Sequence, residues 1–371
     1  MGDVTELKSA SRVHKGEWTD SGVPFFRSSD VMAAINGTTN EKAYISEELY
    51  EKLSNASGKL EEGDVLVTGG GSVGNPYIVP NNEPLYTKDA DLLWIKNQGR
   101  FYPYFLYEYF FSPTFRIYLS SISHVGTIAH YTITQLSETP ISLPDIEEQI
   151  KVGEYFESLD RLITLHQRKC EETKKLKKYM LQKMFPQNGK RVPEIRFAGF
   201  TDDWEQRKLP EFVTFFNGLT YTPDDVEETG TLVLRSSNVK NGEIVDADNV
   251  YVNDKVVTSE NVQEGDIIVV VRNGSRALIG KHAQIKAPMP NTVIGAFMSG
   301  IRSEHSSFVN ALLDTSAFEN EIAKNMGATI NQITGYMFSK MEFMIPSGEE
   351  QQKIGEYFQS FDDLITLHQC K

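Results

Sequence analysis

Cysteine is scarce in this chain, and long apolar runs are absent. The two cysteines, Cys170 and Cys370, show no metal-binding spacing, so we expect a reducing, cytoplasmic environment rather than a disulfide framework or a zinc site. No apolar run reaches the roughly 18 residues of a membrane-spanning helix. The N-terminus also lacks an apolar signal core. We therefore expect a globular chain that has no membrane partner.

The motifs of common catalytic sites are also missing. The chain contains no GxxxxGK[ST] phosphate loop, no HExxH, no CxxC and no GxSxG. The Asn-Pro-Pro-aromatic motif of amino methyltransferases is absent as well, and Asn75-Pro76-Tyr77 comes nearest to it. The seven histidines are scattered. We therefore expect no catalytic residue, no metal and no cofactor in this chain.

One glycine-rich segment resembles a nucleotide site. Residues 69–74 read GGGSVG, follow the strand-like VLVT and match the GxGxxG pattern of dinucleotide-binding folds. That pattern needs a helix directly after the glycines, but Asn75-Pro76-Tyr77 and a β-branched run follow here. A tight turn between two strands is the better interpretation, and such a turn lets backbone N–H groups approach a ligand closely. An enzyme that binds a nucleotide at this turn is a third hypothesis for the function.

An excess of basic residues, which is usual in nucleic-acid-binding proteins, is missing too. The formal net charge is −14, although neutralisation of phosphates supplies much of the affinity of such proteins. The charges are unevenly placed, because no acidic residue occurs between Asp266 and Glu304, where several basic residues lie. A fold could gather such windows on one face. Alternatively, acid-poor windows are simply buried strands.

What the chain does contain is an internal repeat. Residues 149–169 read QIKVGEYFESLDRLITLHQRK, and residues 351–371 read QQKIGEYFQSFDDLITLHQCK, at an offset of 202. Earlier segments match as well, for example FFRSSDV at 25–31 and VLRSSNV at 233–239. Two similar modules at a fixed separation indicate a protein that reads two similar, separated sites. Plain duplication followed by drift gives the same pattern.

Each copy of the repeat predicts a long helix with an apolar seam. Apolar residues recur at alternating spacings of four and three, which is typical of a coiled coil. We expect the two helices to pair with each other in an antiparallel arrangement. His166 within this seam is interpreted as a polar residue that sets the register, with a ligand role as the alternative. The predicted seam consists of Phe156, Leu159, Ile163, His166, Phe358, Phe361, Ile365 and His368.

The predicted fold class is α+β, with two similar globular modules separated by two long antiparallel coiled-coil helices. Short strands alternate with turns in both modules, and the aromatic segment 101–121 has a helical period in its first half. We divide the chain into a first module (1–144), a central long helix (145–185), a linker (186–204), a second module (205–346) and a shorter C-terminal helix (347–371).

Three sequence blocks together resemble the specificity subunits of type I restriction–modification systems. These blocks are LPDIEEQIKVGEYFESLDRLITLHQRKCEETKKLKKYMLQKMF at 143–185, PEIRFAGFTDDWEQRKL at 193–209, and IPSGEEQQKIGEYFQSFDDLITLHQ at 345–369. The resemblance spans essentially the whole chain. It departs from the family pattern at two places, because the first module lacks the RFxGF lead-in and the second helix is shorter than the first. We therefore expect that docking at the second helix, or the spacing of the half-sites, differs.

The resemblance implies a non-catalytic DNA-recognition subunit. Each module would be a target recognition domain that reads one half of a bipartite sequence in double-stranded DNA, and the helices would fix the spacing. Two methylation subunits that carry S-adenosylmethionine would dock on the helices, and ATP-using restriction subunits would be further partners. No cofactor would reside in this chain.

Residue chemistry suggests which side chains contact DNA, since arginine suits guanine, asparagine and glutamine suit adenine, and glycine-rich turns permit close approach. The alternative role for each residue is a turn cap or a hydrogen bond at a strand edge. The candidates of the first module are Arg27, Ser28, Ser72, Asn75, Thr127, His130 and Tyr131. The candidates of the second module are Arg235, Asn238, Arg272, Asn273, Arg276, Lys281, Asn331 and Gln332.

A second hypothesis competes with DNA recognition. In this alternative the two modules form a protein-interaction scaffold that never touches DNA, and the net charge of −14 favours it. The acid-free basic window and the family blocks favour DNA recognition. A split motif retained from a pool of random duplexes would discriminate the two hypotheses.

Overall fold

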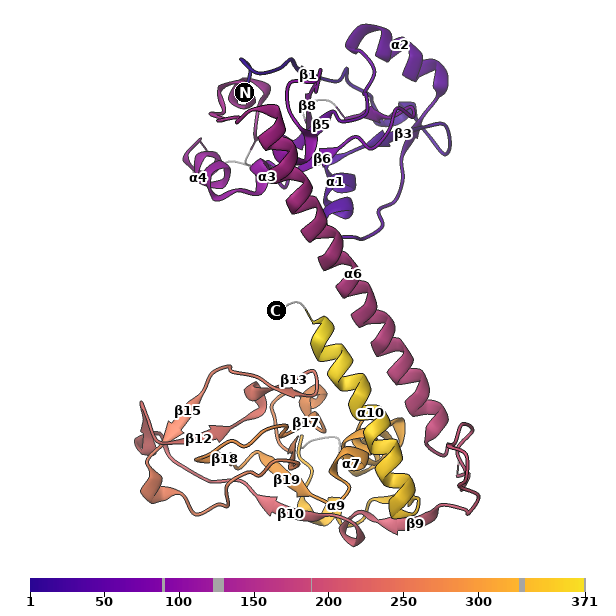
Figure 1. Cartoon of the computed structure of the whole chain (residues 1–371), viewed down its shortest axis with the longest axis vertical. Helices are drawn as coiled ribbons and strands as arrows, with labels where there is room; N and C mark the ends of the chain where they lie inside the picture. The colour runs from indigo at the N-terminus through magenta and orange to yellow at the C-terminus, as the bar shows by residue number, and fades with distance from the viewer. Residues whose placement is uncertain (89–90, 123–129, 188, 327–330, 370–371) are drawn as a thin grey trace. The chain divides into compact units, whose positions relative to one another are not determined.

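The computed structural model describes residues 1–88, 91–122, 130–187, 189–326 and 331–369 (Figure 1). The chain divides into two compact units, Met1–Thr164 and Leu165–Lys371. The division falls inside the long helix α6 (Ile146–Met184), so that each unit contains one part of this helix. The α+β fold class expected from the sequence is correct.

The first unit begins with two small sheets and continues into helices. Its strands are β1 (Leu7–Ser9), β2 (Trp18–Thr19), β3 (Val23–Phe26), β4 (Tyr44–Ile45), β5 (Val65–Thr68), β6 (Pro76–Ile78), β7 (Tyr86–Thr87) and β8 (Leu92–Ile95). Its helices are α1 (Ser28–Ile35), α2 (Glu47–Ser57), α3 (Pro103–Phe111), α4 (Pro113–Ile122), α5 (Ile133–Glu138) and the start of α6. One sheet has the order β1-β8-β5-β6 and is antiparallel, and the other has the order β2-β4-β3-β7 with β3 and β7 parallel.

The second unit contains more strands. They are β9 (Glu205–Lys208), β10 (Thr214–Asn217), β11 (Val226–Glu227), β12 (Thr231–Leu234), β13 (Val239–Lys240), β14 (Glu243–Ile244), β15 (Val250–Val252), β16 (Ile267–Val270), β17 (His282–Gln284), β18 (Thr292–Ile294), β19 (Met298–Arg302) and β20 (Glu342–Ile345). The helices after the first part of α6 are α7 (Ser306–Leu313), α8 (Ser316–Asn325), α9 (Gly335–Phe338) and α10 (Gly348–His368).

The two units repeat the same pair of sheets. The order β10-β19-β16-β17 matches β1-β8-β5-β6, and the order β11-β15-β12-β18 matches β2-β4-β3-β7, again with one parallel pair, β12 and β18. The strands β5 and β16 are buried along their whole length, as expected of apolar central strands. The sequence repeat therefore corresponds to a structural repeat that extends beyond the conserved helices.

Local signals in the sequence explain several boundaries. The glycine-rich segment 69–74 connects the antiparallel strands β5 and β6, so it is a turn between strands, as expected. The aromatic segment forms two helices, each of which starts with a proline, Pro103 or Pro113. Proline is favoured at the first helical position because its missing N–H would have no intrahelical partner there.

In each unit a short helix packs closely on a long one at a glycine. A Cβ atom on Gly153 of α6 would lie 2.4 Å from the Tyr102 ring, and one on Gly355 of α10 would lie 2.7 Å from the backbone nitrogen of Phe308 in α7. These two glycines occupy the same position of the repeat, 202 residues apart. Only glycine permits this approach, so α3 and α7 are held against equivalent points of the two long helices.

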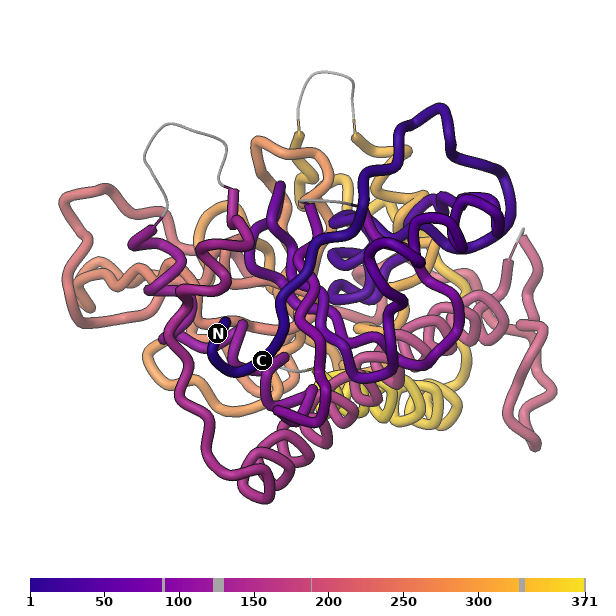
Figure 2. Tube along the Cα trace, turned by 90° about the horizontal axis from the view of Figure 1, so that it is seen from above, coloured from indigo at the N-terminus to yellow at the C-terminus, as the bar shows by residue number. Residues whose placement is uncertain are grey.

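Within the second unit, α10 pairs with the C-terminal half of α6 in an antiparallel arrangement (Figures 1 and 2). The Nδ1 atoms of His166 and His368 lie 2.9 Å apart at one end of the pair. At the other end, the rings of Phe185 and Phe358 lie 6.0 Å apart in the main core of the unit. Residue numbers therefore rise along α6 as they fall along α10.

Candidate nucleic-acid interface

In each unit, the loop after a central buried strand, β5 or β16, contacts a second loop that precedes a short helix. The segment that follows β5 forms a bridge to the segment before α5, at Gly70 and His130. The segment that follows β16 forms the equivalent bridge to the segment before α9, at Arg272 and Gln332. Both bridges obey the 202-residue offset, so these loops occupy matching places. Much of the predicted contact set lies on or beside them.

In the second unit, Arg272 stands out on this loop pair. Its guanidinium lies 5.0 Å from the centre of the Phe297 ring, which is itself 55% exposed. The backbone N–H of Arg272 donates to the Phe297 carbonyl at 3.2 Å, which fixes the base of the side chain. Within the ranges that the structure describes, no carboxylate or carbonyl accepts a hydrogen bond from the guanidinium. Arg272 is therefore an exposed cation that is oriented by an aromatic ring and has its donors available.

Amide side chains surround Arg272. The Asn273 Nδ2 donates to the Ser236 hydroxyl at 3.0 Å, which ties the Arg-Ser-Ser segment to the loop. The Asn331 Nδ2 donates to the Gly274 carbonyl at 3.1 Å. Gln332 is partly exposed beside them. The second unit thus presents a cation, an aromatic ring and carboxamides together, which are the side chains that suit base edges in a groove.

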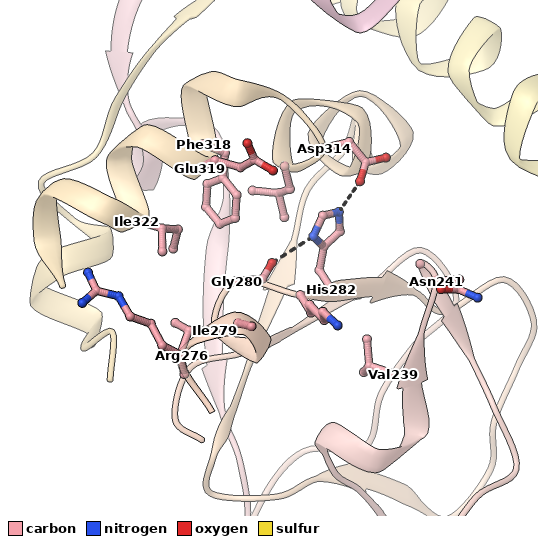
Figure 3. A pocket seen from close by; sticks show the side chains of 14 residues that line it. Val239, Asn241, Arg276, Ile279, Gly280, His282, Asp314, Phe318, Glu319 and Ile322 are labelled. Atoms are coloured by element: carbon pink, nitrogen blue, oxygen red, sulfur yellow. Dashed lines mark hydrogen bonds and ion pairs between the residues drawn. The ribbon is translucent and has the colours of Figure 1, made fainter. Parts of the chain in front are cut away.

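Arg276 and Lys281 lie away from this group. Both are exposed and line a separate pocket together with His282 and Asp314 (Figure 3). As exposed cations, they are suited to contact phosphate rather than a specific base.

In the first unit, the matching loop pair has a different chemistry. Gly70 takes the place of Arg272, and a Cβ atom on it would lie 3.0 Å from the Asp91 carboxylate. The Asp91 carbonyl accepts from the Ser28 hydroxyl at 3.0 Å, and its carboxylate pairs with Lys88. His130 is exposed next to this carboxylate. Asp91 was not among the DNA contacts predicted from the sequence.

Two other candidates of the first unit flank the glycine turn. Ser72 is exposed at its tip. The Asn75 side chain donates to the Ser72 carbonyl at 2.8 Å and accepts from Arg116 at 3.1 Å, so its amide braces the turn. Thr127 lies outside the described residues.

For Tyr131 and Asn238, the predicted DNA contacts are wrong. Tyr131 is 1% exposed and forms a hydrogen bond to Thr139 inside the core. Asn238 is also 1% exposed, accepts from the Arg235 backbone N–H at 2.9 Å and donates to the Ala247 carbonyl at 2.8 Å. Both are internal hydrogen-bonding residues, since a buried side chain cannot reach DNA.

The arginines of the two Arg-Ser-Ser segments also need correction. The Arg27 Nε donates to Asp30 at 2.9 Å, and another guanidinium N–H donates to the Glu41 carbonyl. Arg235 makes the equivalent bond to the Asp248 carbonyl. These arginines connect a helix start to the next loop in both units, so a role as guanine-reading residues is not supported. Because the same bonds recur in both units, these arginines stabilise the fold.

The helix seam is covered along only part of its length. Phe358 and Phe361 are buried, and Ile365, whose carbonyl lies 3.9 Å from the Cys170 sulfur, is partly buried. Phe156 and Ile163 are 40% and 44% exposed, so their assignment to a covered seam is wrong, and Leu159 is partly buried. The reason is that α10 ends at His368, opposite His166, and the pairing begins there.

A polar cluster that the sequence did not reveal joins both helices to the second unit. Lys177 of α6 pairs with Asp314 and with Asp362 of α10, each at 2.6 Å. The Asp314 carboxylate also lies 3.4 Å from the His282 Nε2 (Figure 3). Burial opposes the charge on His282, but the hydrogen bond to Asp314 and its charge outweigh burial and raise the histidine pKa. The pKa of Asp314 is lowered, because these bonds and both cations outweigh its own burial.

These groups do not form a metal centre. Among the described residues, no three histidine, cysteine, aspartate or glutamate side chains are grouped so that they could hold a metal ion. No described helix is long and apolar enough to cross a membrane.

Comparison with protein families gives a match over nearly the whole chain. The sequence model described as "Type I restriction modification DNA specificity domain" matches residues 1–175 and 201–371. Two matches therefore fall on the two structural repeats, with one in each half of the chain.

Curated relatives are named as specificity subunits of type I restriction enzymes. The MjaVIII specificity subunit of Methanocaldococcus jannaschii is 23% identical over 86% of this chain and 76% of its own length. A putative specificity subunit of Haemophilus influenzae is 28% identical over 44% of this chain and 41% of its own length. The EcoKI specificity subunit of Escherichia coli is 27% identical over 42% and 35%, respectively. The match thus spans less than half the length of two of these relatives.

Solved structures share the fold. The crystal structure of the type I restriction–modification S subunit from M. genitalium covers 99% of this chain and 89% of its own, with a TM-score of 0.63 and 14% sequence identity. A chain from a study of assembly and conformational transition of the type I restriction–modification system covers 99% and 90%, with a TM-score of 0.52 and 18% identity.

Proposed function

The chain belongs to the family of type I restriction–modification DNA specificity domains, which are non-catalytic recognition modules, and from this premise we propose that its two modules each read one half of a bipartite DNA target. The observation that carries the proposal is the double occurrence of one loop pair, Gly70 with His130 and Arg272 with Gln332, on two copies of the same sheets. A shared scaffold with different side chains at one edge is what two readers of different sequences need.

We assign the parts of the chain accordingly. Residues 1–144 and 205–346 are the two target recognition domains, and 186–204 is the linker between the first helix and the second domain. The helices at 145–185 and 347–371 set the distance between the half-sites. The antiparallel pairing from His166 to Phe185 supports this role, because paired helices are stiff over several turns.

The N-terminal half of α6 is proposed to bind methylation subunits. Its exposed apolar side chains include Tyr155, Phe156, Leu162 and Ile163. Apolar surface of this kind on a helix is favourable to cover and marks an interaction site. The partner would bring S-adenosylmethionine, and restriction subunits that use ATP would join the same complex, so that this chain itself needs no cofactor.

The acidic net charge fits a subunit that does not hold DNA alone. A chain with a formal charge of −14 repels phosphate at long range. Partner subunits that close around the duplex would supply much of the phosphate contact, while this chain supplies base discrimination. We place this activity in the cytoplasm, where bacterial DNA is accessible.

The test is a selection from a pool of random duplexes with the chain co-expressed with its methylation subunit, followed by sequencing of the retained DNA at several salt concentrations. Recovery of two short conserved blocks at a fixed spacing is the expected result. A stable complex that retains no motif would refute the proposal and favour the protein-interaction scaffold.

A further inference from the structure

The two modules carry different side chains at three matched positions, two on the loop pair and one directly before β8 or β19. The match follows from the backbone, because the Gly69 N–H donates to the Asp91 carbonyl at 2.8 Å and the Val271 N–H donates to the Phe297 carbonyl at 3.0 Å. These positions lie at the same place next to the paired strands β5–β8 and β16–β19. The first module has Gly70, Asp91 and His130, and the second has Arg272, Phe297 and Gln332.

In the second module, the guanidinium of Arg272 supplies hydrogen-bond donors at these positions. A guanidinium offers five N–H donors in a fixed fork and no acceptor. Stacking on the Phe297 ring at 5.0 Å restricts Arg272 to few orientations, so less conformational entropy is lost when it binds. In the major groove only guanine presents two acceptors, N7 and O6, side by side. The geometry therefore suits guanine.

In the first module, Gly70 leaves the position of Arg272 without a side chain, and Asp91, at the position of Phe297, presents an acceptor beside it. A carboxylate accepts hydrogen bonds and offers no donor. The Asp91 side chain is one-third exposed and paired with Lys88, which holds it at the surface. Gly70 provides room for it, because a Cβ atom there would approach the carboxylate to 3.0 Å. Carboxylates repel phosphate and suit the N4 amino group of cytosine.

We propose that these matched positions discriminate bases, with Arg272 selecting guanine in the half-site of the second module and Asp91 selecting cytosine in the half-site of the first. This inference rests on the proposed function, since it requires both modules to face duplex DNA. The exposed cations Arg276 and Lys281 contribute to affinity without sequence preference. The opposite hydrogen-bonding character of the two sites explains how one scaffold reads two different half-sites.

The experiment compares selected motifs for single substitutions in the full complex. Arg272→Ala is expected to reduce the guanine preference at one position of one half-site by about tenfold or more and to leave the other half-site unchanged. Asp91→Asn is expected to reduce the cytosine preference at one position of the opposite half-site by a similar factor. The matched controls are Arg276→Ala, which should weaken binding without changing the motif, and Glu83→Gln, an exposed acid outside the loop pair.

Phe297→Leu provides a second test in the second module, because it removes the stacking surface but keeps an apolar side chain. It is expected to weaken the same guanine preference as Arg272→Ala. Folding is monitored by formation of the complex with the methylation subunit. For a folded Arg272→Ala or Asp91→Asn complex, an unchanged motif overturns the inference while leaving the proposed function intact. Absence of a split motif with the unmodified chain would instead refute the proposed function itself.

Discussion

The ion pair between partly exposed Arg196 and buried Glu350 gives the strongest quantitative prediction for this chain. Arg196, in the linker before the second module, donates from Nε and Nη2 to the two oxygens of Glu350 at 2.8 Å each. Glu350 lies in the first turn of α10 and is 1% exposed. The Arg196→Met variant would leave this carboxylate buried without its cation. Removal of one partner of such a pair typically costs about 3–5 kcal/mol.

The assay is urea denaturation of the full chain in a background in which Trp18 and Trp94 are replaced by phenylalanine, so that the fluorescence reports Trp204, which is buried in the core of the second unit. The Arg196→Met variant should lose about 3–5 kcal/mol in the free energy of unfolding of that unit. The double variant Arg196→Met with Glu350→Gln should recover a large part of the loss, because a neutral amide is less costly to bury than a charge. Glu148, which occupies the equivalent repeat position, is exposed and provides the control Glu148→Gln. If Arg196→Met were as stable as the unmodified chain, or if the losses of the single variants Arg196→Met and Glu350→Gln simply added in the double variant, the pair would not stabilise the fold as argued.

Three further predictions follow from other contacts. The pKa of His282 is raised in the folded chain, so the stability gained from its protonated form is complete below its ordinary pKa of 6.5 and is lost as the pH rises through its pKa in the folded chain. His282→Gln should abolish this pH dependence of the melting temperature. Gly355→Ala should destabilise the second unit by about 1–3 kcal/mol in urea melts, since the new methyl group would meet α7 at 2.7 Å, whereas Gly335→Ala, which has open space, should change little. Phe156→Ser combined with Ile163→Ser should reduce binding of the methylation subunit in pull-downs while leaving the melting temperature nearly unchanged, because both side chains are exposed.

Much of the architecture could be predicted because it repeats. The 202-residue offset predicts two modules and two helices, and the segment after the glycines predicts a turn rather than a nucleotide site. Burial of individual polar residues could not be predicted in the same way. Tyr131 and Asn238 have side chains that suit both a core hydrogen bond and a base contact, and only the packing of Thr139 and Ala247 around them decides between these roles.

The same limit applies to the polar cluster and to the seam. Lys177 and Asp362 lie 185 residues apart, and no local pattern connects them. Heptad spacing predicts which face of α6 is apolar, but it does not specify over what length a partner helix covers that face. Asp91 was not predicted as a DNA contact for a related reason, since it is matched to Phe297 of the second module through backbone hydrogen bonds and not through its sequence neighbours.

The contact between His166 and His368 joins the same position of the two repeats, within the identical stretch LITLHQ in both helices. A crossover between the two coding stretches would therefore join helix to helix in frame and in register. Such an event would remove or add one complete module of 202 residues without interrupting a helix or a sheet. The duplicated stretch is thus a boundary at which one module can be lost or gained in one genetic step rather than through many substitutions.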